Sequence, residues 1–164
     1  MKKFFVALML IAPTAMFAQK FGHVDTQNIM QSLPEISVIN GELQAKQKEL
    51  ENDLTAMQTE FQRKLDDYEK TQSTMNETKR KETEQELQDM NTKIQQTYQQ
   101  SQQTMQQLQQ EKMNPVYEKV RKAIENVGKA GAYTYIFEVG SALYIGSDSK
   151  ELTADVKTEI SKIK

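Results

Sequence analysis

The chain has 164 residues, of which 37% are hydrophobic, with no Cys, no Trp and a single His, His23. This length allows one ordinary domain, and the missing Cys excludes a disulfide framework and a thiol nucleophile. The formal net charge is −2; without residues 1–18, which carry Lys2 and Lys3, 19 basic residues face 23 acidic ones and the charge becomes −4. An acidic chain is not expected to bind nucleic acid.

Residues 1–18 have the features of a signal peptide. Lys2 and Lys3 form the positive start, and the apolar run FFVALMLIA that follows is too short to span a bilayer. We expect cleavage after Ala18, with a retained anchor as the alternative. Export of a chain without Cys indicates a periplasmic protein.

The segment after the signal peptide predicts a strand and a short helix. Alternating side chains predict a strand over residues 21–25, and Asp25 or Thr26 is suited to cap a brief helix. Pro34 favours the first turn of the next helix, and Glu35 suits the positive end of that helix.

Two long series of apolar positions predict two long helices, because their steps are mostly three, four or seven residues. The first series contains Ile36, Ile39, Leu43, Leu50, Leu54, Met57, Phe61, Leu65 and Tyr68. The second contains Leu87, Met90, Ile94, Tyr98, Ser101, Met105, Leu108, Val116, Val120, Ile124 and Val127.

The stretch QQTYQQSQQTMQQLQQ at 95–110 lies within the second series. Ten of its 16 residues are Gln, and none is charged. Tyr98, Met105 and Leu108 continue the apolar stripe, and Gln is a good helix former. We therefore interpret the tract as a helix with an uncharged surface, in preference to a disordered linker.

The two series mirror each other, as expected of an antiparallel hairpin. The residue numbers of facing positions, such as Leu54 and Ser101, add to 155, which places the fold-back between Glu77 and Thr78. We expect a helical arm over 42–112 with its tip near 73–81. At about 1.5 Å per residue, the arm would be on the order of 50 Å long.

Two helices cannot cover both sides of the seam between them. Large apolar side chains at the seam are therefore expected to stay in partial contact with water, although most of them serve as core. Met is flexible enough to adapt to different partners. The expected client-binding residues are Met57, Phe61, Met75, Met90, Tyr98 and Met105.

Two further features of the arm have alternative interpretations. Pro115 predicts either a hinge where the arm meets the body or the start of a new helix. The basic cluster Lys79, Arg80 and Lys81 is expected at the tip, where such a run is most often a solvated turn. The alternative is contact with acidic clients or with membrane lipid head groups.

The C-terminal third predicts a small β-stranded body. VGKAGA should end the long helix, with Gly128 or Gly131 as its cap. YTYIFEVG at 133–140 and SALYIGS at 141–147 read as two strands, and residues 149–164 as a helix with Thr153 as N-cap and Leu152, Val156, Ile160 and Ile163 on one face.

The expected fold class is mainly α, with a long antiparallel helical hairpin on a small β-stranded body formed by residues 19–41 and 113–164. A body of this size is marginal as a lone core, which favours an oligomer. No catalytic, cofactor-binding or metal-binding pattern is present, so we expect a protein that is not an enzyme and needs no cofactor. His23 is interpreted as a hydrogen-bonded structural residue.

Two segments, GHVDTQNIMQSLPE after the signal peptide and YIFEVGSALYIGSDSKELTADVKTEI near the end, resemble the Skp/OmpH family of periplasmic chaperones. The resemblance implies a homotrimer whose β-stranded trimerisation body carries three helical tentacles around a cavity. It also implies an ATP-independent periplasmic holdase that binds unfolded outer-membrane proteins and prevents their aggregation. The alternative is a non-catalytic coiled-coil envelope adaptor or spacer that binds one dedicated folded partner.

Overall fold

The computed structural model describes residues 19–163, and the predicted signal peptide lies outside them. The described chain divides into two compact units. We call residues 28–121 the hairpin unit, and residues 19–27 with 122–163 the sheet unit. The hairpin unit is longer than the arm predicted over 42–112, and the trimerisation role of the remaining residues stays a prediction.

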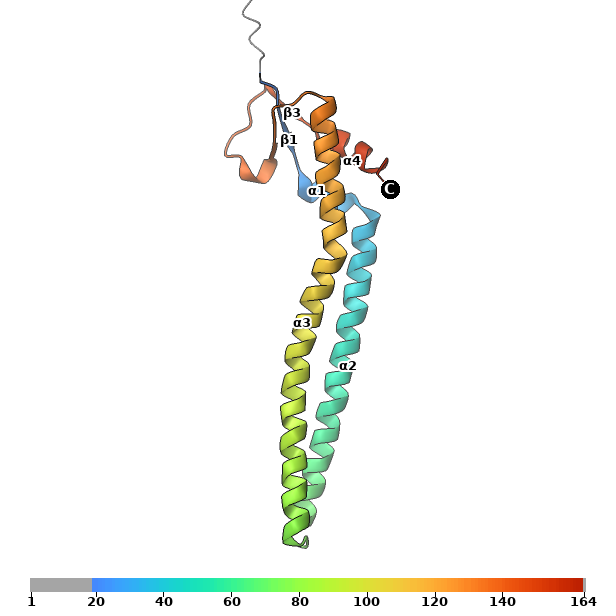
Figure 1. Cartoon of the computed structure of the whole chain (residues 1–164), viewed down its shortest axis with the longest axis vertical. Helices are drawn as coiled ribbons and strands as arrows, with labels where there is room; N and C mark the ends of the chain where they lie inside the picture. The colour runs from blue at the N-terminus through green and yellow to red at the C-terminus, as the bar shows by residue number, and fades with distance from the viewer. Residues whose placement is uncertain (1–18, 164) are drawn as a thin grey trace, which may run out of the picture. The chain divides into compact units, whose positions relative to one another are not determined.

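The hairpin unit is built from two long helices that run antiparallel and side by side (Figure 1). Helix α1 spans Thr26–Ser32, α2 spans Pro34–Thr71, and α3 spans Glu77–Ala130, with its residues up to 121 in this unit. Pro34 begins α2, as predicted. The glutamine-rich tract is helical throughout, as predicted, and lies within α3.

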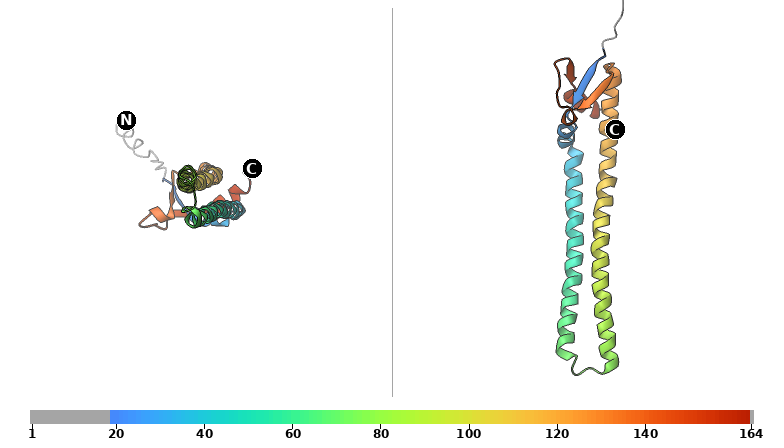
Figure 2. Two further views of the ribbon diagram at one scale, coloured as in Figure 1. Left: turned by 90° about the horizontal axis from the view of Figure 1, so that it is seen from below. Right: turned by 90° about the vertical axis from the view of Figure 1, so that its left-hand side faces the viewer.

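The fold-back lies earlier than the sequence mirror predicts. The two helices are joined by residues 72–76, whereas Glu77 and Thr78 already belong to the first turn of α3 (Figure 2, right). The side-chain oxygen of Asn76 accepts a hydrogen bond from the Lys79 amide at 2.8 Å. Asn76 therefore caps α3 and fixes where the helix begins.

Pro115 lies inside α3, which continues on both sides of it. The alternative of a new helix beginning at Pro115 is therefore wrong. Proline has no amide hydrogen for the carbonyl of Glu111 one turn earlier, so this turn lacks one backbone hydrogen bond. The role of Pro115 as a hinge stays a prediction.

The sheet unit contains three short parallel strands. β1 spans Phe21–Val24, β2 spans Tyr135–Glu138 and β3 spans Ser149–Glu151, in the order β2-β1-β3. Both outer strands pair with β1 in parallel, with Phe21 opposite Tyr135 and Ser149. The strands predicted over 21–25 and 133–140 are thus confirmed in shorter form.

The strand predicted over 141–147 is wrong. A short 3₁₀ helix, η1 at Val139–Ser141, follows β2, and residues 142–148 form a connection outside the sheet. Because β2 and β3 both run parallel to β1, this connection must return from one end of the sheet to the other. It cannot do so as a neighbouring strand of the same ladder.

The last helix, α4 at Thr153–Ile160, is shorter than the predicted 149–164. Its buried face carries Val156 and Ile160 next to buried Leu152, as predicted. Thr153 is not the N-cap, because that position belongs to Leu152. The Thr153 hydroxyl instead accepts a hydrogen bond from the Asp25 amide at 2.9 Å, which ties α4 to the end of β1.

The core of the sheet unit lies between the inner face of β1 and the apolar face of α4. A Cβ atom added to Gly22 would stand only 2.4 Å from Leu152 Cδ1, so the helix entry packs directly on the strand backbone. The Asn126 side chain donates a hydrogen bond to Glu159 at 2.9 Å, which links α3 to α4 within this unit.

The C-terminus of α3 ends in a Schellman motif, in which Tyr133 N–H donates to Gly128 O at 3.0 Å and Ala132 N–H donates to Lys129 O at 3.2 Å. The residue with left-handed backbone geometry is Ala132, at φ 52°. Of the predicted caps, Gly131 directly follows the last helical residue, Ala130, but both Gly128 and Gly131 precede the left-handed position and neither occupies it. Helices usually place Gly there.

We expect Ala132→Gly to raise the free energy of unfolding, because the left-handed conformation strains an alanine by roughly 1 kcal/mol. The greater freedom of glycine in the unfolded chain offsets part of this gain. Chemical denaturation of both proteins measures the difference. As the matched control, Gly131→Ala should destabilise, since its Cβ would lie 2.3 Å from the Tyr133 ring. A less stable Ala132→Gly protein would contradict this account.

Candidate functional site

The seam between α2 and α3 is only half covered over most of the hairpin unit. Full burial occurs at Ile39, Leu87, Val116 and Val120. In contrast, intermediate exposure is found at Leu43, Leu50, Leu54, Met57, Phe61, Leu65, Met90, Ile94, Met105 and Leu108. The incompletely covered seam predicted from the sequence is therefore present, and its apolar side chains keep some access to solvent.

A groove of about 360 Å³ opens in this seam. Leu50 and Leu54 of α2 form one wall, and Tyr98 and Met105 of α3 form the other, with Ser101 between them. Gln47, Glu51 and Gln102 complete the lining. The groove therefore has an apolar interior and an amide-rich rim.

The small side chain of Ser101 explains why the seam contains this groove. Its side chain is buried, at 7% exposure, at a position where the seam elsewhere carries mostly larger apolar residues. Its hydroxyl donates a hydrogen bond to the Thr97 carbonyl at 2.8 Å, one turn earlier in α3. The Ser101 hydroxyl therefore has its hydrogen-bond partner within α3. It needs no further partner from the space between the two helices.

The predicted client-binding residues fall into different places. Tyr98 and Met105 both line the groove, and Tyr98 is 56% exposed. Met57, Phe61 and Met90 are half-buried elsewhere on the seam, and Met75 lies in the turn. Client binding by these residues stays a prediction.

The sequence placed three further groove residues, Leu50, Leu54 and Ser101, on the seam without assigning them to a site. The sequence feature that could have indicated the groove is the mirror relation, which pairs the large Leu54 with the small Ser101. A mismatch in size at facing positions indicates a gap.

Three ion pairs join the two helices and fix their register. Glu35 pairs with Lys119 at 2.8 Å and Glu42 with Lys112 at 2.6 Å, while Lys64 pairs with Glu86 nearer the turn. The numbers of these pairs add to 154, 154 and 150, and not to the predicted 155.

These contacts shift several pKa values. The hydrogen bond from Lys119 lowers the pKa of Glu35, and the hydrogen bond to Glu42 raises the pKa of Lys112. The hydrogen bond that the Tyr68 hydroxyl donates to Glu84 raises the pKa of Tyr68. Each shift favours the protonation state that holds the two helices together.

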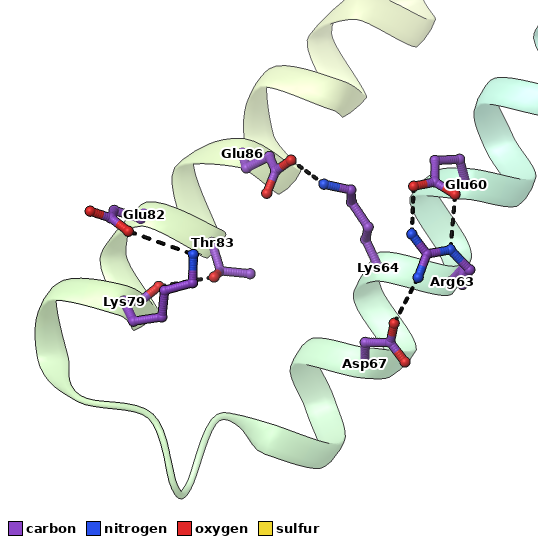
Figure 3. Close-up of polar contacts among 8 residues, drawn as sticks. All are labelled: Glu60, Arg63, Lys64, Asp67, Lys79, Glu82, Thr83 and Glu86. Carbon is purple, nitrogen blue, oxygen red and sulfur yellow. Dashed lines mark hydrogen bonds and ion pairs between the residues drawn. The ribbon is translucent and has the colours of Figure 1, made fainter.

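The predicted basic cluster at the tip lies in the first turns of α3 and not in the turn itself. Lys79 is 3.7 Å from Glu82, and Lys81 is 2.7 Å from Glu77 (Figure 3 shows the Lys79 pair). These carboxylates offset the lysine charges locally. Contact of the cluster with lipid head groups or acidic clients stays a prediction.

The sheet unit exposes an aromatic surface that the sequence reasoning missed. Phe21, Tyr135 and Phe137 stack with ring centroids 5.9–6.5 Å apart. Tyr135 is 56% exposed and Phe137 47%. The signal was present in the alternation of aromatic residues along β2, which places Tyr135 and Phe137 on one face of the strand.

In the neighbouring connection, Tyr144 lines one pocket together with Phe21 and Phe137. Leu143 is fully exposed and Tyr144 is 85% exposed. Beside them, His23 Nδ1 lies 2.9 Å from the Ser149 hydroxyl oxygen, which agrees with the predicted structural role of this histidine. Monomeric soluble proteins rarely expose large contiguous apolar patches, so this face indicates an interaction surface.

Within residues 19–163, no group of three or more potential metal-ligating side chains is found. No helix in the same part of the chain is both long and apolar enough to cross a membrane.

Comparison with known proteins places the chain in a family. The sequence profile of the OmpH-like outer membrane proteins matches residues 20–160, and the chain belongs to this family. No curated protein sequence matches it. A crystal structure from Caulobacter crescentus, described as that of a proposed OmpH-like outer membrane chaperone, has a similar fold. That fold matches with a TM-score of 0.75 at 13% identity, over 88% of this chain and 85% of the other.

We expect Glu35→Gln to lower the stability at neutral pH by about 0.5 kcal/mol, a small value because the carboxylate is partly exposed. The folded protein lowers the pKa of Glu35, so its contribution is present above the unfolded pKa and is lost as the pH falls through the lowered value. Denaturation at several pH values should therefore show the two proteins converging in acid.

The matched control is Glu49→Gln, because Glu49 pairs with Lys46 within one turn of α2. Glu49→Gln should lower the stability less than Glu35→Gln does. A Glu35→Gln difference that persists unchanged below the lowered pKa would contradict the assigned ion pair.

Proposed function

We propose that the protein is an ATP-independent periplasmic holdase that binds unfolded outer-membrane proteins between helical arms and prevents their aggregation. The observation that carries the proposal is the half-covered apolar seam along the hairpin unit. Membership of the OmpH-like family and the fold shared with a proposed outer membrane chaperone support it.

The binding mechanism follows from the surface of the hairpin. Half-buried Leu, Met and Phe side chains offer many weak apolar contacts, and Met adapts its shape to different clients. Residues 94–110 of α3 carry no charge. Clients are then held by apolar contact and amide hydrogen bonds, with little dependence on their charge, and the many weak contacts add up.

Self-association through the sheet unit is the second part of the proposal. The stacked Phe21, Tyr135 and Phe137, together with Leu143 and Tyr144, form an apolar face that three copies of the chain would bury. A homotrimer would place three arms around one cavity. Adjustment near Pro115 would then change the width of the cavity.

The mature protein is expected to suppress aggregation of a denatured outer-membrane β-barrel protein diluted from urea, at near-stoichiometric trimer. Light scattering measures the effect, which should change little between low and moderate salt because the seam side chains proposed to bind the client are apolar. No suppression would overturn the holdase. Specific capture of one folded partner, without binding of unfolded proteins, would support the adaptor alternative.

The self-association surface is tested by Phe137→Glu, which places a charge in the aromatic face. Sedimentation equilibrium should give a trimer for the unmodified protein and a monomer for the variant, because an unpaired charge is costly to bury. Tyr117→Glu is the matched control, since Tyr117 is 55% exposed on α3 in the hairpin unit. A trimeric Phe137→Glu protein would place the interface elsewhere.

A further inference from the structure

We propose that the groove around Ser101 binds one uncharged aromatic side chain of an extended, unfolded client segment. The inference rests on the proposed holdase function and deepens it, because it names one subsite and the class of side chain that the subsite takes. It concerns Leu50 and Leu54 of α2 with Tyr98, Ser101 and Met105 of α3.

The size of the groove comes from the one buried polar residue of the seam. Ser101 is 7% exposed and Tyr98 is 56% exposed, so the groove has a covered floor and a mouth that is open to solvent. Its volume of about 360 Å³ lies near the lower end of the range for small-ligand pockets, about 300–1,000 Å³. It is therefore large enough for a ring and too small for a folded element.

The polar groups of the groove have partners within their own helices, and the lining disfavours an anionic occupant. The Ser101 hydroxyl donates to the Thr97 carbonyl, and the one carboxylate in the lining, Glu51, accepts a hydrogen bond from Gln47 at 2.7 Å. The facing part of α3 has no charge. A carboxylate side chain would lose its hydration, find no cation in the lining and stand near the Glu51 carboxylate.

The walls favour an aromatic ring over an aliphatic chain. Tyr98 presents an exposed ring, and aromatic pairs gain stability beyond the area they bury. Met105 supplies a thioether on the same wall, and sulfur makes favourable contacts with ring edges. Leu50 and Leu54 complete an apolar slot opposite them.

The rim fits an extended peptide. In such a segment successive side chains point to opposite sides, so one ring can enter the groove while its neighbours stay in water. The side-chain amides of Gln47 and Gln102 stand at the rim, where they can donate to or accept from a peptide backbone. Strands of outer-membrane barrels alternate in this way and carry aromatic girdles.

The absence of Trp from the chain makes a direct test available. A short neutral peptide with alternating polar residues and one Trp is titrated with the mature protein, and only the peptide is excited. The emission should shift to shorter wavelength in a saturable way. The same peptide with Leu or Asp in place of Trp, used as a competitor, should bind more weakly, and Asp least.

Ser101→Leu fills the groove and should weaken binding of the Trp peptide about tenfold or more, as expected from burial of one large apolar side chain. Ser101→Ala keeps the groove open and should bind like the unmodified protein. Gln100→Leu, on an exposed position of the same helix, controls for added hydrophobicity. Circular dichroism and thermal unfolding verify that each variant keeps its helices.

The outcomes separate this inference from the proposed function. If Ser101→Leu binds the Trp peptide as well as the unmodified protein does, the subsite is overturned, even where aggregation is still suppressed. Equal competition by the Leu peptide would overturn the aromatic assignment. A Ser101→Leu protein that changes its mass in solution without changing peptide affinity would show that a second copy of the chain occupies the groove. Failure of the unmodified protein to suppress aggregation overturns the holdase function. The peptide titration still decides whether the groove binds an aromatic side chain.

Discussion

The structure of the hairpin unit depends on one geometric constraint: two helices can bury only the sides that face each other. The seam residues of α2 and α3 therefore reach full burial at few positions, and most of them remain half exposed. In a compact domain a third layer would cover this surface. Here the apolar area that remains is the basis of the proposed binding of unfolded chains, because such chains offer apolar groups of their own.

A pair of helices with so shallow a seam needs other means to fix its register. The contacts Glu35–Lys119, Glu42–Lys112 and Lys64–Glu86 supply them along the length of the hairpin. Exposed ion pairs contribute little stability each, but they penalise a slip of one helix along the other. Register matters for the groove, since a slip of one helix would move Leu50 and Leu54 away from Tyr98, Ser101 and Met105.

The two units present different kinds of apolar surface. The aromatic face of the sheet unit is concentrated in stacked rings and an exposed connection, which suits a permanent interface. The seam of the hairpin unit is thin and long, and glutamines border it over residues 95–110 of α3, which suits weak and reversible contact. This division matches a protein that associates with itself through one unit and with varied clients through the other, as proposed for this member of the OmpH-like family.

The sequence by itself determined the two long helices, the helical state of the glutamine tract, and the strands of Phe21 and Tyr135, because these depend on local periodicity and propensity. The tertiary structure alone decided the turn at 72–76, where capping by Asn76 overrides the apolar mirror. It also decided that residues 141–147 leave the sheet, since parallel pairing of β2 and β3 with β1 requires a return path. The groove at Ser101 and the aromatic face were likewise decided by the tertiary structure. A gap or a patch depends on which side chains face each other and not on their order in the chain.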